Sequence, residues 1–233
     1  MRTEGGISRI LEYDLAAHAE RVISPPTVNA YSRLDVSPDD KQIVFVRAAG
    51  TSPDPPGMDQ TCLSTVDLAT GSLRDVNCIT GVYVDPSYSP SGAEFLVSVS
   101  GFESADVGLL AKDGSAYRSV ACCFQPRFFP DGQSILAQVS EYYGPAGTFK
   151  SSLTSQEYTR LPIPPNSGLE IAPDGGRVVL VDIDSQGQPR LNVLDLTTGQ
   201  RRAVTTGSMP AWQPAYPYPV ILLPGIMGSA LAN

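Results

Sequence analysis

The chain has 233 residues and a formal net charge of -8 at pH 7. An acidic chain repels phosphate groups, so this charge argues against binding to nucleic acid and to anionic membrane surfaces. No run of roughly 18 apolar residues occurs, which argues against a membrane-spanning helix, and the start of the chain shows no long apolar segment of the kind found in secretory signals.

The first predicted element is a β-hairpin over residues 8–24, with the sequence SRILEYDLAAHAERVIS. Its centre, from Asp14 to His18, matches a turn that recurs later in the chain with glycine in the last position. Histidine is one of the non-glycine residues that are enriched at positive φ. We therefore expect His18, the single histidine of the chain, to serve this turn rather than to act as a catalytic base.

Four stretches that follow share one pattern, in which a short strand, a turn built on Pro-Asp-Gly or a near relative, and an apolar strand succeed one another. Proline presets one backbone angle of such a turn and glycine permits another. The pattern recurs roughly every 40 to 50 residues, close to the length of a four-stranded propeller blade. The stretches are RLDVSPDDKQIVFV (33–46), PSYSPSGAEFLVSV (86–99), PRFFPDGQSILAQV (126–139) and LEIAPDGGRVVLVD (169–182), with a fifth, broken copy in PAWQP, which ends at Pro214.

A second unit recurs after three of these stretches and has the form of a hairpin with glycine at the left-handed position of its turn. Together, the two units predict blades whose inner strands are apolar and whose outer strands form a hairpin. The three copies of the second unit are STVDLATGSLRDV (64–76), GLLAKDGSAYRSV (108–120) and LNVLDLTTGQRRAV (191–204).

The register of the first of these hairpins places two cysteines opposite each other. If Leu68 pairs with Ser72 across the turn, then Cys62 pairs with Cys78 on the adjacent strand. One interpretation is a disulfide between Cys62 and Cys78, which an extracytoplasmic location favours. The other is two buried free thiols, because strand registers slip by one residue.

No metal site and no cofactor site follow from the residue spacing. Cys122 and Cys123 are adjacent, so strand alternation sends their side chains to opposite faces. The stretch VDIDSQGQP (181–189) begins like a calcium loop, but Val193 stands where such a loop needs a bidentate glutamate. A polar turn between two strands explains this stretch better.

The repeats resemble the WD40-like β-propeller repeats of TolB and those in the N-terminal propellers of prolyl-oligopeptidase-type enzymes, over residues 7–214. The resemblance implies an all-β propeller of four-stranded blades in residues 1–214. Four blades are complete in the sequence. In one alternative, the N-terminal hairpin joins the strands at the C-terminal end to close a ring of about five blades, which removes exposed edges. In the other, the chain is an incomplete part of a larger propeller.

The last segment, residues 215–233, carries a different pattern. Its stretch PVILLPGIMGS begins with an apolar run that is typical of a buried strand, and Gly225 and Gly228 allow the loop that follows to bring N–H groups close to a ligand oxygen. This stretch resembles the start of the α/β-hydrolase domain of lecithin:cholesterol acyltransferase-like lipases. The resemblance implies that Ile226 lends its N–H to an oxyanion hole.

The other parts of such an enzyme are missing from the sequence. It contains no G-x-S-x-G nucleophile elbow, and the histidine lies at the wrong end of the chain to follow a nucleophile and an acid. We therefore predict a non-catalytic module that binds a protein or peptide on one face of the propeller. The alternative is the N-terminal accessory part of a larger lipase-like or acyltransferase-like hydrolase, covalently linked to a catalytic domain that this chain lacks.

Overall fold

The computed structural model describes residues 2–207 except 5–6, 15–16, 25–26, 29, 54–55, 101–104, 123, 140, 142–144, 156 and 165–167. The described residues form 21 β-strands and no helix, so the all-β prediction is confirmed, and none of their elements is a helix that could cross a membrane. The chain divides into two compact units, residues 1–128 and residues 129–233, and each is described by itself.

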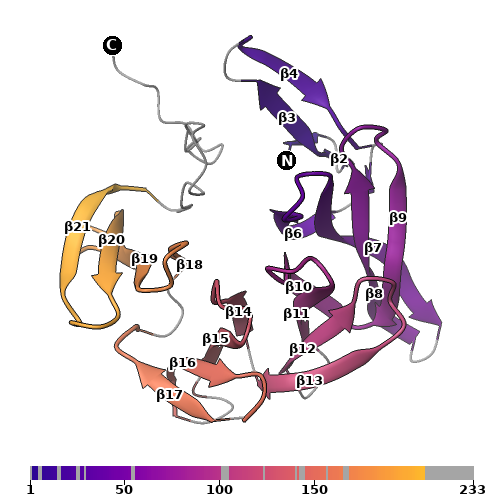
Figure 1. Cartoon of the computed structure of the whole chain (residues 1–233). Helices are drawn as coiled ribbons and strands as arrows, with labels where there is room; N and C mark the ends of the chain where they lie inside the picture. Colours follow the sequence, from indigo (N-terminus) through magenta and orange to yellow (C-terminus); the bar gives the residue numbers. More distant parts are fainter. Residues whose placement is uncertain are drawn as a thin grey trace. The chain divides into compact units, whose positions relative to one another are not determined.

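The first unit begins with two small sheets and continues with two sheets of four antiparallel strands each (Figure 1). We call each four-stranded sheet a blade, numbered in chain order. The small sheets contain β1 (Arg2–Glu4), β2 (Ile7–Arg9) and β5 (Thr27–Val28), and the hairpin of β3 (Leu11–Asp14) and β4 (Ala19–Val22). The first blade contains β6 (Ala30–Val36), β7 (Gln42–Pro53), β8 (Pro56–Asp67) and β9 (Leu73–Thr80), and the second contains β10 (Val82–Tyr88), β11 (Glu94–Ser100), β12 (Ala105–Ala111) and β13 (Tyr117–Cys122).

The third and fourth blades follow the same order, so that neighbours in the chain are neighbours in each sheet (Figure 1). The first strand of the third blade ends at Phe128. The strands of this blade are β14 (Phe124–Phe128), β15 (Ser134–Val139), β16 (Gly147–Ser152) and β17 (Tyr158–Leu161). The fourth blade contains β18 (Leu169–Ile171), β19 (Arg177–Ile183), β20 (Pro189–Asp195) and β21 (Arg201–Thr206).

One end of every blade carries two tight turns, between its first and second strands and between its third and fourth strands. We call this the turn end. A backbone hydrogen bond links the two turns in each blade, which shows that the Pro-Asp-Gly repeat of the sequence builds the same local structure four times. The four linking bonds run from Leu68 N to Lys41 O (2.8 Å), Lys112 N to Ala93 O (3.0 Å), Leu153 N to Gln133 O (2.9 Å) and Leu196 N to Gly176 O (2.8 Å).

The second strands of the blades supply more of the buried apolar side chains than the first, third or fourth strands do, as the apolar runs of the sequence predict. Phe45 in β7, Phe95 in β11 and Leu180 in β19 are fully buried. In the first unit, one apolar cluster centres on Phe95 and a second on Phe45. In the second unit, a separate cluster packs around Leu136 and Leu180. Burial of these alternating faces provides the main stabilisation of the sheets.

The N-terminal hairpin packs against the first blade. Ile10 and Ile23, which flank the hairpin, are buried and belong to the same cluster as Phe45. His18 lies in the turn with a φ of 49°, which confirms its predicted role. The Asp14 carboxylate supports this turn by accepting a hydrogen bond from the Ala17 N–H at 2.9 Å.

Two contacts show how the hairpin meets the first blade. The Arg21 guanidinium donates to the Leu68 carbonyl oxygen at 3.2 Å. The Ile23 carbonyl oxygen lies so close to Gly71 that a Cβ atom there would approach it to 2.7 Å.

The outer pair of the first blade makes the same two contacts with the second blade. The Arg74 guanidinium donates to the Asp113 carbonyl oxygen at 3.3 Å, and the Val76 carbonyl oxygen lies against Gly114, where a Cβ atom would approach it to 2.3 Å. The N-terminal hairpin therefore takes the place of the outer half of a preceding blade. The expectation that it joins strands from the C-terminal end falls on residues 208–233, outside the described residues.

Candidate functional site

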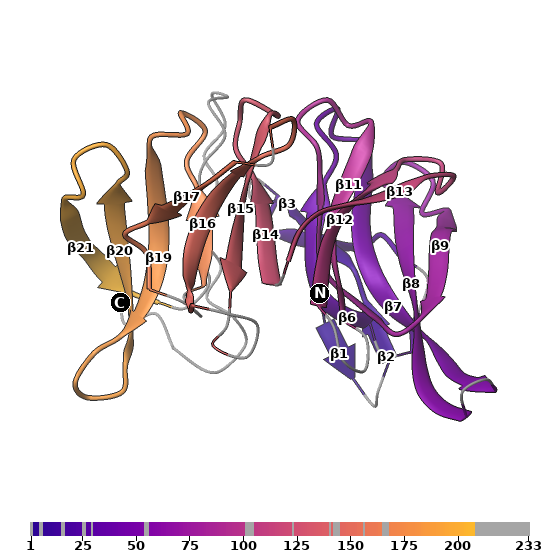
Figure 2. The same ribbon diagram turned by 90° about the horizontal axis from the view of Figure 1, so that it is seen from below.

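The other end of each blade carries the connections between the second and third strands and from each blade to the next. We call this the loop end. The loop end of the first blade differs most from those of the other blades. Its strands β7 and β8 have 12 residues each, compared with 7 in β11 and in β12 of the second blade. The β7–β8 ribbon extends beyond the other strands of its blade (Figure 2). Function is concentrated in such connections, which a rigid scaffold positions.

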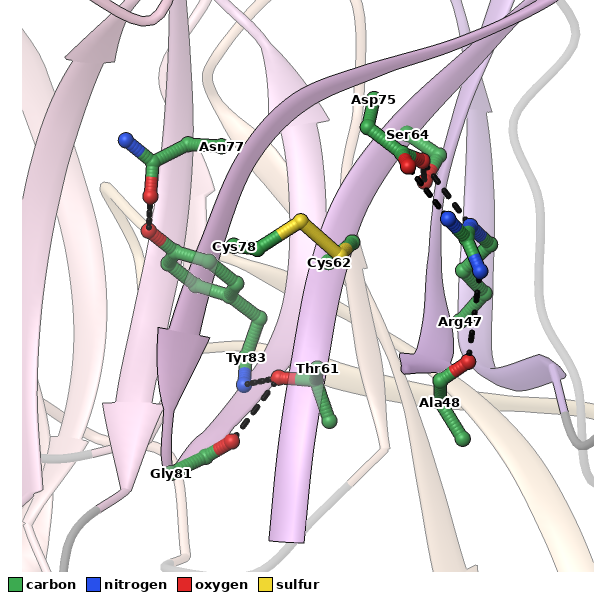
Figure 3. Close-up of a disulfide and its surroundings, with 10 residues drawn as sticks. All are labelled: Arg47, Ala48, Thr61, Cys62, Ser64, Asp75, Asn77, Cys78, Gly81 and Tyr83. Atoms are coloured by element: carbon green, nitrogen blue, oxygen red, sulfur yellow. Dashed lines mark hydrogen bonds and ion pairs between the residues drawn. A yellow bond between two sulfur atoms is a disulfide. The ribbon is translucent and has the colours of Figure 1, made fainter. Parts of the chain in front are cut away.

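A disulfide joins Cys62 of β8 to Cys78 of β9 at the base of this ribbon (Figure 3). The two residues are direct cross-strand partners, with Cα atoms 4.0 Å apart. Cys62 is 1% exposed, whereas Cys78 is exposed. The outer strand is therefore covalently held at the loop end of the blade, where no tight turn joins β8 to β9.

The register that leads to the cysteines differs from the prediction. Near the turn, Val66 pairs with Leu73 and Ser64 with Asp75, one residue away from the expected partners. Val76 is an extra residue, a β-bulge, and beyond it the register returns to the expected pairing. The cysteines therefore meet because the bulge offsets the shift that begins at the turn.

A charged cluster lies on the same face of the blade, next to the disulfide (Figure 3). Arg47 of β7 pairs directly with Cys62, and its guanidinium bonds both carboxylate oxygens of Asp75 on β9, with Nε to Oδ1 at 2.9 Å. The buried Ser64 hydroxyl donates to the same carboxylate at 2.7 Å. The hydrogen bonds from Arg47 hold the pKa of Asp75 below its usual value, so the carboxylate is ionised at neutral pH.

On the opposite face of the first blade, β8 and β9 contact the start of the second blade. The Thr61 hydroxyl donates to the Gly81 carbonyl oxygen at 3.0 Å and accepts from the Tyr83 N–H at 2.9 Å. The Tyr83 hydroxyl donates to Asn77 Oδ1 at 3.0 Å (Figure 3). Burial raises the pKa of Tyr83 to about 12, so this side chain stays a neutral hydrogen-bond donor.

The second blade has a different polar cluster at the corresponding place. Asp106 of β12 accepts hydrogen bonds of 2.6 Å from Tyr117 and from Ser119, both on β13. Gly108 makes room for the Tyr117 ring, because a Cβ atom on Gly108 would lie 2.2 Å from it. Burial, and then the bond to Asp106, raise the pKa of Tyr117. The cluster is therefore specific to this blade.

In the fourth blade, Asp182 of β19 is the centre of a third polar cluster. Asn192 of β20 donates to its carboxylate at 2.7 Å, and Arg201 of β21 forms an ion pair with it. Acid and base have exchanged strands relative to Arg47 and Asp75. The loop ends thus carry different charge arrangements on sheets of the same design.

Aspartates in the turns accept hydrogen bonds from residues of the same turn. Asp67 accepts from the N–H and hydroxyl of Thr70, both at 2.8 Å, and these bonds lower its pKa. Asp184 accepts from the N–H groups of Gln186 and Gln188, both at 2.9 Å. The turn interpretation of residues 181–189 therefore agrees with the hydrogen bonding of Asp184. Such carboxylates remain ionised and lack the raised pKa of a general acid.

The other residues singled out in the sequence lie elsewhere. Gly225, Ile226 and Gly228 lie outside the described residues, so an oxyanion-type loop stays a prediction. Cys122 ends β13, and the expected divergence of its side chain from that of Cys123 involves a residue that is not described. The Arg47–Asp75 cluster escaped the sequence analysis because its two residues are far apart in the chain. The alternation of β7 and β9 could have placed them on one face, but only in the bulged register.

Comparison with solved structures identifies the architecture. No family model matches the chain. TolB from Acinetobacter baumannii is similar with a TM-score of 0.68 at 18% sequence identity, over 86% of this chain and 49% of that chain. A putative TolB from Agrobacterium tumefaciens is similar with a TM-score of 0.65 at 20% identity, over 86% of this chain and 71% of that chain.

Enzymes are also among the similar structures. Oligogalacturonate lyase from Vibrio parahaemolyticus has a TM-score of 0.65 at 18% identity, over 88% of this chain and 62% of that chain. This chain thus spans about half of the Acinetobacter TolB and less than two thirds of the lyase. At these identities the likeness establishes the fold: the chain is built of TolB-like β-propeller blades, as the sequence predicts.

Proposed function

We propose that this chain is a binding module that holds a protein or peptide ligand at the loop end of its blades and does no chemistry on it. The contrast between the two ends carries the proposal. The turn end repeats the same hydrogen bonds in all four blades, whereas the loop end carries the long β7–β8 ribbon and a different polar cluster in each of three blades. Diversity on a constant scaffold is typical of binding surfaces.

The likeness to two TolB structures supports the proposal at the level of the fold, because TolB-like blades are a scaffold that many functions share. The disulfide supports an oxidising, extracytoplasmic compartment for the protein. The net charge of -8 favours a ligand with basic groups. We therefore expect peptides rich in lysine or arginine to be preferred.

A peptide-display selection on the immobilised chain tests this function. Selected peptides should lose binding to Thr51→Arg and Asp59→Arg variants, because both positions are exposed on the β7–β8 ribbon. They should keep binding to Thr70→Arg and Thr198→Arg variants, whose sites are exposed at the turn end. Equal loss in the two pairs of variants, or selection of no peptide, would contradict the proposal.

An accessory role in a larger hydrolase is the second candidate. One similar structure is a puromycin-hydrolysing peptidase from Mycobacterium tuberculosis, with a TM-score of 0.60 at 14% identity, over 92% of this chain and 46% of that chain. The stretch PVILLPGIMGS at residues 219–229 favours an esterase or acyltransferase as the linked domain. The purified chain should neither hydrolyse p-nitrophenyl esters nor react with a fluorophosphonate probe. A longer chain with a Gly-x-Ser-x-Gly motif beyond Asn233 should do both.

A further inference from the structure

We propose that reduction of the Cys62–Cys78 disulfide converts the base of the β7–β8 ribbon into a site for a thiophilic divalent cation such as Zn²⁺. The ligands are the two cysteine sulfurs and the Asp75 carboxylate. In the structure these atoms lie within 4.8 Å of one another, on one face of the first blade. Two thiolates and a carboxylate are a ligand set that zinc accepts, with water in the fourth position.

The geometry supports a compact site. Sulfur and oxygen ligands around a tetrahedral zinc lie about 3.3–3.8 Å apart, given usual zinc–ligand distances. The two cysteines are cross-strand partners with Cα atoms 4.0 Å apart. Once the covalent bond is broken, side-chain rotation alone can separate the sulfurs to this distance. Cross-strand partners on both sides, Thr61 with Ile79 and Leu63 with Asn77, continue the ladder that keeps the strands together.

The surroundings of Asp75 balance the charge. Two thiolates and one carboxylate carry three negative charges, while Zn²⁺ and the Arg47 guanidinium together carry three positive charges. Arg47 bonds both oxygens of the carboxylate and Ser64 bonds one of them, at 2.7 Å. If the cation takes Oδ2, then Oδ1 keeps its bonds to Arg47 Nε and to Ser64. Such outer partners orient a ligand and strengthen the site.

Exposure of Cys78 provides the route to the reduced state. Cys78 is exposed, whereas Cys62 is buried, so we expect a small thiol to attack at Cys78. A thiolate attacks the Cys78 sulfur and forms a mixed disulfide, and Cys62 leaves as a thiolate beside Arg47. A second thiol attacks the small-molecule sulfur, releases Cys78 and leaves as a small-molecule disulfide. Two thiols are oxidised and one protein disulfide is reduced, and cation binding then displaces the remaining thiol protons.

A titration with Cd²⁺ and Zn²⁺ tests the proposal. A Cys122→Ser/Cys123→Ser chain retains no cysteine except the proposed pair. After reduction with a phosphine under anaerobic conditions, this chain should bind one Cd²⁺, with sulfur-to-cadmium charge-transfer absorption. An excess of Zn²⁺ should compete with Cd²⁺ for the site, and Zn²⁺ alone should raise the melting temperature of the reduced chain. The oxidised chain should bind neither ion with these signatures.

Three variants in the same background locate the site. Cys78→Ser should abolish the charge-transfer signal of a two-thiolate site. Asp75→Asn should weaken binding by at least about tenfold, whereas Asp113→Asn, a control in an exposed turn of the second blade, should bind as before. Far-ultraviolet circular dichroism checks that each variant is folded. No ion bound by the reduced, folded chain, or equal binding by Cys78→Ser, would overturn the proposal; equal affinity of Asp75→Asn would overturn the assignment of the carboxylate.

Discussion

The turn end and the loop end of the blades are built from the same strands but behave differently from blade to blade. At the turn end, one hydrogen bond between the two turns recurs four times within 0.2 Å, from 2.8 to 3.0 Å. At the loop end, the first blade has a disulfide and an arginine–aspartate pair, and the second a tyrosine–aspartate pair. The positions that recur in every copy therefore specify the scaffold, and the positions that vary between the copies carry most of the individuality of each blade.

A second difference separates the third blade from the other three. The outer strand pairs of the first, second and fourth blades each contain a β-bulge, at Val76, Val120 and Val204. These valines end the three copies of the second sequence unit. The β16–β17 pair of the third blade, where the sequence shows no copy of the unit, is paired without a bulge. The recurring valine is therefore the mark of a bulged outer strand.

Removal of the N-terminal hairpin should have the largest effect on the scaffold. Deletion of residues 1–24 removes Ile10 and Ile23 from the cluster around Phe45. Truncation of one buried isoleucine typically costs about 2–5 kcal/mol, so we expect the melting temperature to fall by about 10 °C or more, or the chain not to fold. Differential scanning calorimetry measures the change.

Point variants test whether the deletion acts through the loss of buried side chains or through the shortening of the chain. Ile23→Ala should lower the free energy of unfolding by about 2–4 kcal/mol. Val22→Ala, one residue away and 56% exposed, should change it by less than about 0.5 kcal/mol. Similar losses in the two variants would mean that the hairpin does not pack as described.

The next prediction concerns the contact between the outer strand of the first blade, at Val76, and the turn of the second blade, at Gly114. Gly114 and Gly199 occupy the same turn position at φ values of 83° and 70°. Alanine at either site costs about 1–2 kcal/mol for the left-handed conformation. At Gly114 the new Cβ also meets the Val76 carbonyl oxygen, whereas at Gly199 it meets nothing within 4 Å. Chemical denaturation should therefore show an additional loss of about 1–3 kcal/mol for Gly114→Ala.

The outcome that contradicts this prediction is an equal loss in the two glycine variants. It would show that the bulge carbonyl of Val76 moves freely, and that the close approach of the outer strand to the turn contributes nothing to stability.

Loss of the disulfide should be the main weakening at the loop end. The bridge closes a loop with a sequence separation of 16, for which chain entropy gives about 3 kcal/mol of stabilisation. A Cys62→Ala/Cys78→Ala chain should lose this amount in urea denaturation. A Cys122→Ala/Cys123→Ala chain, which removes the other described disulfide-bonded cysteine, Cys122, shows how specific this loss is to the Cys62–Cys78 bridge. An unchanged midpoint in the first chain would mean that the strand ladder alone holds β9.

The turn end could be predicted from sequence because local chemistry determines it. Proline, aspartate and glycine at fixed offsets specify each turn, and His18 could be placed at positive φ by the same logic. At the loop end only the pairing of Cys62 with Cys78 could be predicted, because the other contacts there join residues whose strand pairing the sequence does not reveal. Asp75 meets Arg47 only in the bulged register, and the valine at the end of each copy of the second unit can be recognised as a bulge only once the strand pairing is known.

The smallest expected change in stability comes from lowering the pH, which protonates aspartates in the turns at the turn end. Hydrogen bonds from Thr198, through its N–H and its hydroxyl, hold the pKa of Asp195 below the ordinary value of 3.8, and Asp67 is held in the same way. Because these pKa values are lower in the folded chain, the carboxylates stabilise it above about pH 4, and this contribution is lost as the pH falls through the folded values. Thermal melts at descending pH should thus show a decrease in melting temperature that begins near pH 4.

An Asp67→Asn/Asp195→Asn chain keeps an acceptor at each turn but no titrating group, so its melting temperature should depend less on pH in that range. If the two chains had the same pH dependence, acid sensitivity would have to come from carboxylates away from the turns.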